Sequence, residues 1–297
     1  PTQTKRTAEQ DEYQQFSTPP MHAYVAAWVA NIHRGESMLE PSAGIGGLAI
    51  FADLAGARVT VNELSQRRAA VLRDVLPNAR MFNENAEQLN NVLPDDVKPT
   101  VIVMNPPFSA TAGRMQGARK TEVGAQHIEQ ALKLLADKGR LVAIVGEGMA
   151  MDKPAFKAWW DKIRTEYNVR ANVGMPGKDY AKYGTTFDNQ LLVIDKTGPT
   201  TGKIITDTIA SIEELPKLLE GVRNDRPETD QAGEPDAAQP GREEVPAGGV
   251  AAGGVARIEP DAVGTGEQAG DRTAEPVATD TGDGRGPSEP ARPGQPE

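Results

Sequence analysis

The chain has 297 residues, contains no cysteine and carries a formal net charge of −10 at pH 7. The absence of cysteine excludes disulfide bonds and thiolate metal sites, and the three histidines, His22, His33 and His127, are too scattered to form an obvious metal-binding motif. No apolar run approaches the ~20 residues of a membrane-spanning helix, and the N-terminal residues lack the apolar segment of a signal peptide. We therefore expect a soluble, cytoplasmic protein without a bound metal ion.

The negative charge is concentrated in the C-terminal third of the chain. Residues 201–297 contain 20 of the 42 acidic and 9 of the 32 basic residues, which leaves 22 acidic and 23 basic residues in the first 200. The nearly neutral first 200 residues are therefore compatible with a nucleic-acid partner. Residues 224–297 consist mainly of Pro, Gly, Ala, Asp, Glu and Thr, which predicts a disordered acidic tail. The tail is either a solubilising linker or a segment that recruits a partner or mimics nucleic acid.

Strands and helices alternate between residues 37 and 196. The expected strands cover residues 37–43, 58–64, 79–85, 99–108, 139–148, 168–176 and 189–196. The expected helices cover residues 21–33, 46–56, 65–75, 122–138, 152–167 and 209–222, with Ser65 and Asp152 as N-caps. This order predicts an α/β fold with a doubly wound, mostly parallel, seven-stranded sheet and helices on both faces. We divide the chain into an N-terminal arm (1–20), this domain (21–200), a short strand or helix extension (201–223) and the tail (224–297).

The first expected strand runs into a glycine-containing loop, EPSAGIGG (residues 40–47). In a doubly wound sheet, ligands bind beyond the C-terminal ends of the strands, where glycine lets the backbone approach a cofactor. Glu63 follows Gly44 by 19 residues, near the ~20 expected for an acid that accepts hydrogen bonds from ribose hydroxyls. Glu40, before the loop, would repel a pyrophosphate and attract a cation, so the pattern favours S-adenosylmethionine over a dinucleotide. The alternative is a tight turn that binds no ligand.

The stretch VIVMNPPFS (residues 101–109) begins as a buried strand and ends at two prolines. Proline stops the strand because it has no amide hydrogen for the ladder. Together with QFSTPP (15–20), LEPSAGIGG (39–47) and VNEL (61–64), the stretch MNPPF (104–108) resembles the motifs of S-adenosylmethionine-dependent amino-methyltransferases, in particular the N6-adenine DNA methyltransferases. The resemblance spans about residues 14–196. A looser one links the chain to the methyltransferase segment of large phage and plasmid-borne helicase-like proteins.

The resemblance implies a class I methyltransferase fold, S-adenosylmethionine as cofactor and DNA as substrate. An exocyclic amine on an aromatic ring is a poor nucleophile, because its lone pair is delocalised into the ring. The side-chain oxygen of Asn105 and the carbonyl of Pro106 can accept hydrogen bonds from the two N–H groups of the amine. These bonds favour a pyramidal nitrogen with an available lone pair. Pro107 stiffens the turn, and Phe108 offers a face on which a flipped-out base stacks. A strand-ending turn with a packed phenylalanine is the structural alternative.

The same resemblance assigns the cofactor site residue by residue. Asn85 occupies a position that usually holds Asp, which makes it a departure from the family pattern. The expected cofactor-binding residues are Phe16, Thr18, Pro19, Glu40, Pro41, Ala43, Gly44, Gly46, Glu63, Leu64, Asn85, Ala86 and Asn105.

Two segments beyond the sheet are candidates for substrate binding, because basic side chains hold phosphates and tyrosines stack on bases. They contribute Arg114, Arg119 and Lys120 in residues 109–124, and Lys178, Tyr180, Lys182 and Tyr183 in residues 177–189. A solvated segment without a ligand is the alternative for each. No stretch after residue 200 resembles a target-recognition domain, so we expect weak sequence specificity or specificity supplied by a partner protein.

Other functions are compatible with the same motifs. Enzymes that methylate RNA bases or the amide of protein glutamine act on similar planar nitrogens, and QFSTPP favours DNA adenine over these. A non-catalytic cofactor-binding or interaction module is a third reading, against which the intact Asn105-Pro106-Pro107-Phe108 stretch argues.

Overall fold

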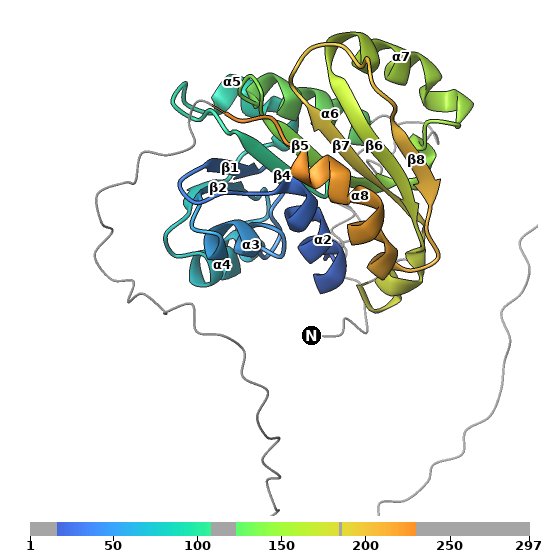
Figure 1. Ribbon diagram of the computed structural model, residues 1–297. Helices are drawn as coiled ribbons and strands as arrows, with labels where there is room; N and C mark the ends of the chain where they lie inside the picture. Colours follow the sequence, from blue (N-terminus) through green and yellow to red (C-terminus); the bar gives the residue numbers. More distant parts are fainter. Residues whose placement is uncertain (1–16, 108–122, 184–185, 230–297) are drawn as a thin grey trace, which may run out of the picture. The chain divides into compact units, whose positions relative to one another are not determined.

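The structure is a computed structural model and describes residues 17–107, 123–183 and 186–229. Its central element is an eight-stranded sheet (Figure 1). Its strand order is β3-β2-β1-β4-β5-β7-β6-β8. The strands are β1 (Ser37–Glu40), β2 (Arg58–Asn62), β3 (Arg80–Phe82), β4 (Val101–Met104), β5 (Arg140–Gly146), β6 (Asn168–Met175), β7 (Asn189–Asp195) and β8 (Ile205–Thr208). β7 is antiparallel to both neighbours, and all other adjacent pairs are parallel. The predicted doubly wound, mostly parallel α/β fold is confirmed, with β8 as an additional edge strand.

Helices cover both faces of this sheet. They are α2 (Pro20–Ala30), α3 (Ala49–Leu54), α4 (Gln66–Val75), α5 (Leu89–Val92), α6 (Val123–Leu134), α7 (Lys157–Glu166) and α8 (Leu215–Asn224). The short 3₁₀ turns are η1 (Ala86–Gln88), η2 (Glu147–Met149), η3 (Pro154–Phe156), η4 (Gly177–Tyr183) and η5 (Ile212–Glu214). One core joins α2, α3, α4 and α8 to the sheet, and the other joins α5, α6 and α7.

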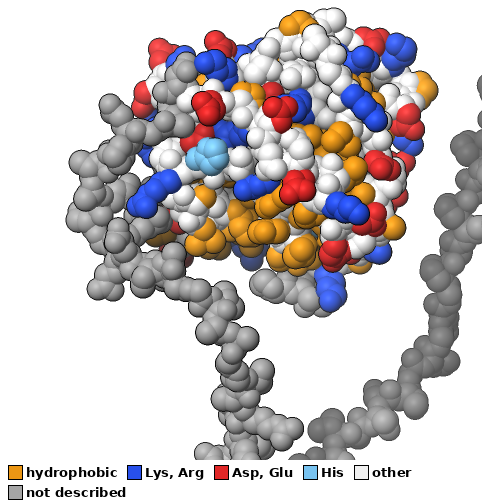
Figure 2. Space-filling model, in the orientation of Figure 1, with side chains coloured by type: hydrophobic (Ala, Val, Ile, Leu, Met, Phe, Trp, Pro, Cys, Tyr) orange, Lys and Arg blue, Asp and Glu red, His pale blue; other side chains and the backbone are white. Residues whose placement is uncertain are grey.

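Side chains of the central strands alternate between these two cores. In β4, Val101 and Val103 belong to the first core, whereas Ile102 and Met104 belong to the second. A strand buried on both faces reads as a continuous apolar run, which is why β4 was recognisable from its sequence. Figure 2 shows that hydrophobic side chains also gather on the surface near α2, where Met21 and Tyr24 are each nearly half exposed.

Some predicted helix boundaries were wrong. The Ser65 side chain does accept a hydrogen bond from the Arg68 backbone N–H (3.5 Å) and caps α4 as predicted. Asp152 does not cap the following helix, because that segment begins with η3 after Lys153 and has no side-chain cap there. The helix expected over residues 46–56 is shorter, since the glycine loop continues to the start of α3 at Ala49.

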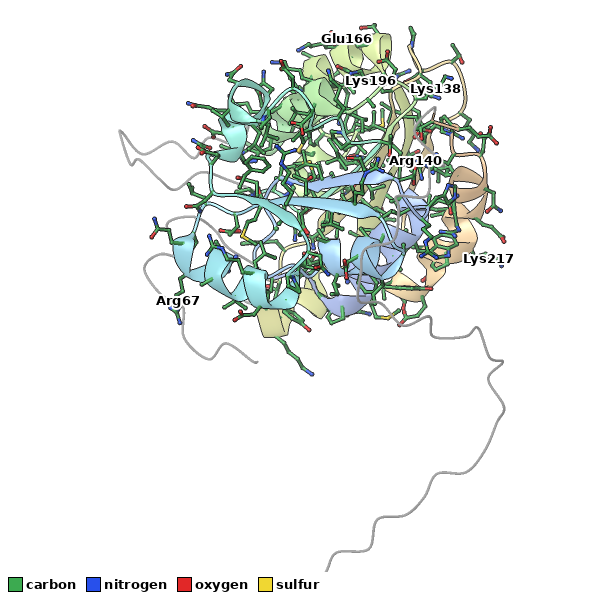
Figure 3. The ribbon with its side chains drawn as sticks, turned by 90° about the vertical axis from the view of Figure 1, so that its left-hand side faces the viewer. Arg67, Lys138, Arg140, Glu166, Lys196 and Lys217 are labelled. Atoms are coloured by element: carbon green, nitrogen blue, oxygen red, sulfur yellow. The ribbon has the colours of Figure 1, made fainter. Side chains whose placement is uncertain are left out.

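A buried ion pair holds the helices against the sheet. Arg140 and Asp195 face each other across the β5–β7 ladder, and both side chains are fully buried. The Arg140 Nε and Nη2 donate to the Asp195 carboxylate at 2.7 and 2.9 Å. Its Nη1 donates to the carbonyls of Val29 in α2 (3.1 Å) and Val222 in α8 (2.8 Å). Figure 3 shows Arg140 inside the molecule, whereas Arg67 and Lys217 lie at its edges.

We predict that Asp195→Asn destabilises the fold strongly, because it leaves the Arg140 charge buried without a counterion. The expected loss is about 3–5 kcal/mol in the free energy of unfolding, measured by chemical denaturation. Asp161→Asn is the matched control, since it breaks the exposed Lys157–Asp161 pair and should change little. Equal effects of the two substitutions would contradict this role of the ion pair.

Candidate functional site

The candidate active site lies at the C-terminal edge of the sheet between β1 and β4. The chain leaves β1 toward α3 on one face and leaves β4 toward α6 on the other. Such a switch in direction opens a crevice at which ligands bind in doubly wound sheets. The glycine loop after β1 and Asn105 after β4 both lie at this switch point, where such a crevice is expected.

Two glycines shape the loop after β1. Gly44 and Gly46 have φ angles of 58° and 87°, which L side chains rarely adopt. A Cβ on Gly46 would lie 2.9 Å from Cδ1 of Leu72 in α4, so a larger residue there would force the Leu72 side chain to shift. The loop is also tied to β2, because the Ala43 N–H donates to the Asn62 carbonyl at 2.8 Å. Its backbone is therefore held where a ligand can approach it closely.

The Glu63 carboxylate lies against this loop. One of its oxygens accepts from the Gly44 N–H (2.7 Å) and the other from the Ser65 N–H (2.8 Å). In doubly wound folds, an acid at this position accepts hydrogen bonds from vicinal ribose hydroxyls. This geometry fits the nucleoside half of a cofactor.

Glu40 is an almost fully buried acid, with 2% of its surface exposed. Its Oε2 accepts from the Ala49 N–H at the start of α3 (2.8 Å). Burial raises the pKa of Glu40 well above its ordinary value, the Ala49 hydrogen bond partly opposes this, and the negative charge of Glu63 raises it further. A cation bound in the crevice would favour the ionised carboxylate, so the acid pair suits a positively charged ligand.

Asn105 is held in a fixed orientation by the segment that precedes α2. Its Nδ2 donates to the Thr18 hydroxyl oxygen at 2.9 Å. Because Nδ2 and Oδ1 lie on opposite sides of Cγ, the acceptor oxygen points away from Thr18. Pro106 is buried beside it, and Pro107 is partly exposed. The contact therefore orients a hydrogen-bond acceptor at the end of β4.

The structure brings most of the predicted cofactor residues to this edge. Thr18 and Pro19 lie just before α2, and the glycine loop follows β1. Glu63 and Leu64 follow β2. Ala86 begins η1 after β3, and Asn85 caps this turn, because its Oδ1 accepts from the Glu87 N–H at 3.0 Å. Phe16, Phe108, Arg114, Arg119 and Lys120 lie outside the described residues.

The four candidates in residues 177–183 differ in exposure. Lys178 and Lys182 are exposed, and Tyr183 packs partly against the core. Tyr180 is fully buried and meets His22 edge to face, with 4.9 Å between the ring centroids. Burial also raises the pKa of its hydroxyl. Tyr180 therefore presents no free ring face to a base, which corrects its predicted place among the substrate contacts.

Comparison with solved structures identifies the fold. No protein-family model matches the chain, and no curated protein matches its sequence. Similar structures include the modification subunit of a type I restriction enzyme from Vibrio vulnificus (19% identity, TM-score 0.57, 71% of this chain and 53% of that one). Another is the methyltransferase subunit of a type I restriction-modification system from Streptococcus thermophilus (16%, 0.57, 70% and 53%). A third is a class I S-adenosylmethionine-dependent methyltransferase from Listeria monocytogenes (14%, 0.55, 74% and 73%).

The chain has the class I methyltransferase fold. It spans about half the length of the two restriction-modification subunits. Within residues 17–107, 123–183 and 186–229, no helix is long and apolar enough to cross a membrane, and no three His, Asp or Glu side chains gather as a metal site. At these identities the likeness extends to the fold alone.

Two exposed apolar side chains lie near the candidate site and were not indicated by the sequence motifs. Ile45, between the two loop glycines, is 43% exposed, and Phe187 is 68% exposed. The next residue, Asp188, accepts from the Glu147 N–H (3.0 Å) just after β5, which places Phe187 beside the end of β5. β5 is the neighbour of β4 in the sheet, so Phe187 lies at the same edge as Asn105. The only sequence signal for Phe187 was an aromatic residue in a polar loop.

We predict that Glu40→Gln changes how the stability of the unliganded protein depends on pH. With a raised pKa, neutral Glu40 stabilises the fold fully below the ordinary value of 4.5, and this stabilisation is lost as the pH rises through the raised pKa. Relative to the wild type, Glu40→Gln should therefore gain stability with rising pH in that window, by about 1.4 kcal/mol per pH unit. Denaturation at several pH values measures the difference, with the exposed Glu166→Gln as control.

Proposed function

We propose that this chain binds S-adenosylmethionine and transfers its methyl group to the exocyclic N6 amine of adenine in DNA. The observation that carries the proposal is the oriented Asn105 amide at the same edge of the sheet as Glu40, Glu63 and the glycine loop. This reaction requires three features: an acid that binds the nucleoside, a buried acid suited to a cation, and a hydrogen-bond acceptor for a planar amine. The shared fold of the methyltransferase subunits above supports it.

Each residue has a chemical task in this proposal. When bound, S-adenosylmethionine supplies a methyl group on a cationic sulfur. Asn105 Oδ1 and the Pro106 carbonyl accept the two amine hydrogens, which draws the nitrogen toward a pyramidal geometry with an available lone pair. Glu63 accepts from the ribose hydroxyls, and Glu40 lies toward the cationic end. No general base is required, since the proton can leave after the methyl group has been transferred.

The substrate side of the proposal uses the exposed part of the sheet edge. Phe187, together with Phe108 of the motif, would stack on a base that has left the helix. Lys178 and Lys182 are exposed and would contact phosphates, although Lys178 Nζ also donates to the Ala210 carbonyl (3.2 Å). We further propose that sequence specificity is weak or comes from a partner protein.

The test is methyl transfer from labelled S-adenosylmethionine to unmethylated DNA, followed by digestion to nucleosides and mass spectrometry. N6-methyladenine should appear with the wild type, and Asn105→Ala should lower kcat by about 10²–10³-fold while cofactor binding persists, because one acceptor for the reacting amine is lost.

Other outcomes separate the competing functions. Transfer to RNA or to a glutamine amide, but not to DNA, would retain the reaction and change the substrate. Cofactor binding without transfer to any of the three would indicate a non-catalytic module. An Asn105→Ala variant as active as the wild type would refute the role of the amide.

A further inference from the structure

We propose that Asn62, assisted by Asn83, is a positioning residue that sets the geometry of the cofactor site before the cofactor binds. The proposal rests on the proposed function, because it concerns the same crevice. Asn62 is the last residue of β2 and only 1% exposed. Neither asparagine belongs to the glycine loop or to the acids that would contact the cofactor.

The Asn62 amide joins three segments that otherwise diverge. Its Nδ2 donates to the carbonyls of Pro41, after β1, and Glu84, after β3, both at 2.9 Å. Its Oδ1 accepts from the Glu84 N–H at 2.8 Å, and its backbone carbonyl accepts from the Ala43 N–H at 2.8 Å. Both amide hydrogens and the amide oxygen are therefore used within the edge of the sheet.

The position of these bonds explains why a side chain is needed. The β1–β2 ladder ends at the Glu40–Val61 pair, and the β2–β3 ladder ends at the Asn62–Phe82 pair. Beyond these pairs the three chains separate to form the site. A buried amide has the same donor and acceptor groups as a peptide unit, so Asn62 extends the hydrogen bonding past the end of both ladders.

Asn83 makes the reciprocal connection from the other side. Its Nδ2 donates to the carbonyls of Glu63 and of Leu64, the latter at 2.9 Å. We call Asn62 and Asn83 together the amide clamp. Glu63 follows directly after Asn62, and Asn85 follows directly after Glu84. The clamp thus fixes the backbone of Glu63, the acid proposed to bind the ribose, and the backbone of Glu84, which precedes Asn85.

The functional consequence is preorganisation. A site held in its bound geometry does not have to be ordered when the ligand arrives, so more of the contact energy appears as affinity. Methyl transfer also requires the reacting atoms about 3–3.5 Å apart and in line, and a shifted cofactor would lose that alignment. Loss of the clamp should therefore weaken cofactor binding beyond any general loss of stability.

Asn62→Asp tests this inference, and Asn172→Asp is its matched control. Asn172 is also buried in a strand (4% exposed), and its amide bonds the Met149 carbonyl and the Met151 N–H, both at 3.3 Å, away from the cofactor crevice. In Asn62→Asp, an ionised oxygen would face two carbonyls. We expect both variants to lower Tm, and only Asn62→Asp to raise the Kd of S-adenosylmethionine, by about tenfold or more by calorimetry.

Two further measurements distinguish positioning from general damage. The ratio of the Asn62→Asp Kd to the wild-type Kd should shrink as the pH is lowered, since protonation restores one donor. The KM for the cofactor should rise more than kcat falls. If Asn62→Asp does not fold, Asn83→Ala is the alternative test of the clamp, because Asn83 is exposed and its replacement should not prevent folding. We expect the Kd of S-adenosylmethionine to rise about threefold in Asn83→Ala, at unchanged Tm.

The outcomes separate this inference from the proposed function. A wild type that binds and transfers methyl groups, with an Asn62→Asp Kd no higher than that of Asn172→Asp, would overturn the clamp alone. If Asn62→Asp does not fold, an unchanged Kd of S-adenosylmethionine in Asn83→Ala would also overturn the clamp alone. A wild type that does not bind S-adenosylmethionine would overturn both.

Discussion

The buried contact between Arg140 and Asp195 is the constraint on which the arrangement of helices and strands depends. A guanidinium removed from water must have its donors satisfied, because an unpaired buried charge is costly. Asp195 accepts two hydrogen bonds from Arg140, and the carbonyls near the C-terminal ends of α2 and α8 accept two more. These carbonyls lack partners within their own helices, so the ion pair and the two helix ends stabilise one another.

This anchoring reaches the site through α2. The helix has 11 residues and is therefore about 16 Å long. Its C-terminal end lies near Arg140 at the start of β5, and its N-terminal end follows Thr18, which holds Asn105 beyond the end of β4. A rigid helix fastened at one edge of the sheet thus orients a side chain at the opposite edge.

The sequence was sufficient to predict the sheet and its two covered faces, because buried parallel strands leave strong local patterns. It also indicated the glycine loop, whose Gly44 and Gly46 have positive φ angles. It was insufficient where the deciding contacts are distant in sequence. Residues 201–223 were expected only as a short strand or helix extension, and β8 was not predicted as part of the sheet since its residues are mostly exposed. Tyr180 was misassigned because its burial against His22 involves a helix far away in the chain. Asn62 was read only as part of a motif, since its side-chain partners lie in two other loops, after β1 and after β3.

The antiparallel direction of β7 has a consequence for how such a site can diversify. Because β7 runs against its neighbours, both the exit from β6 and the entry to β7 lie at the edge that carries Asn105. The connection between them is a hairpin on the far side of β5, separate from β1, β2 and β3. Insertions or deletions in this hairpin can therefore remodel one part of this edge while the part formed by β1, β2 and β3 keeps its geometry. In the proposed function, substrate preference could then evolve independently of cofactor binding.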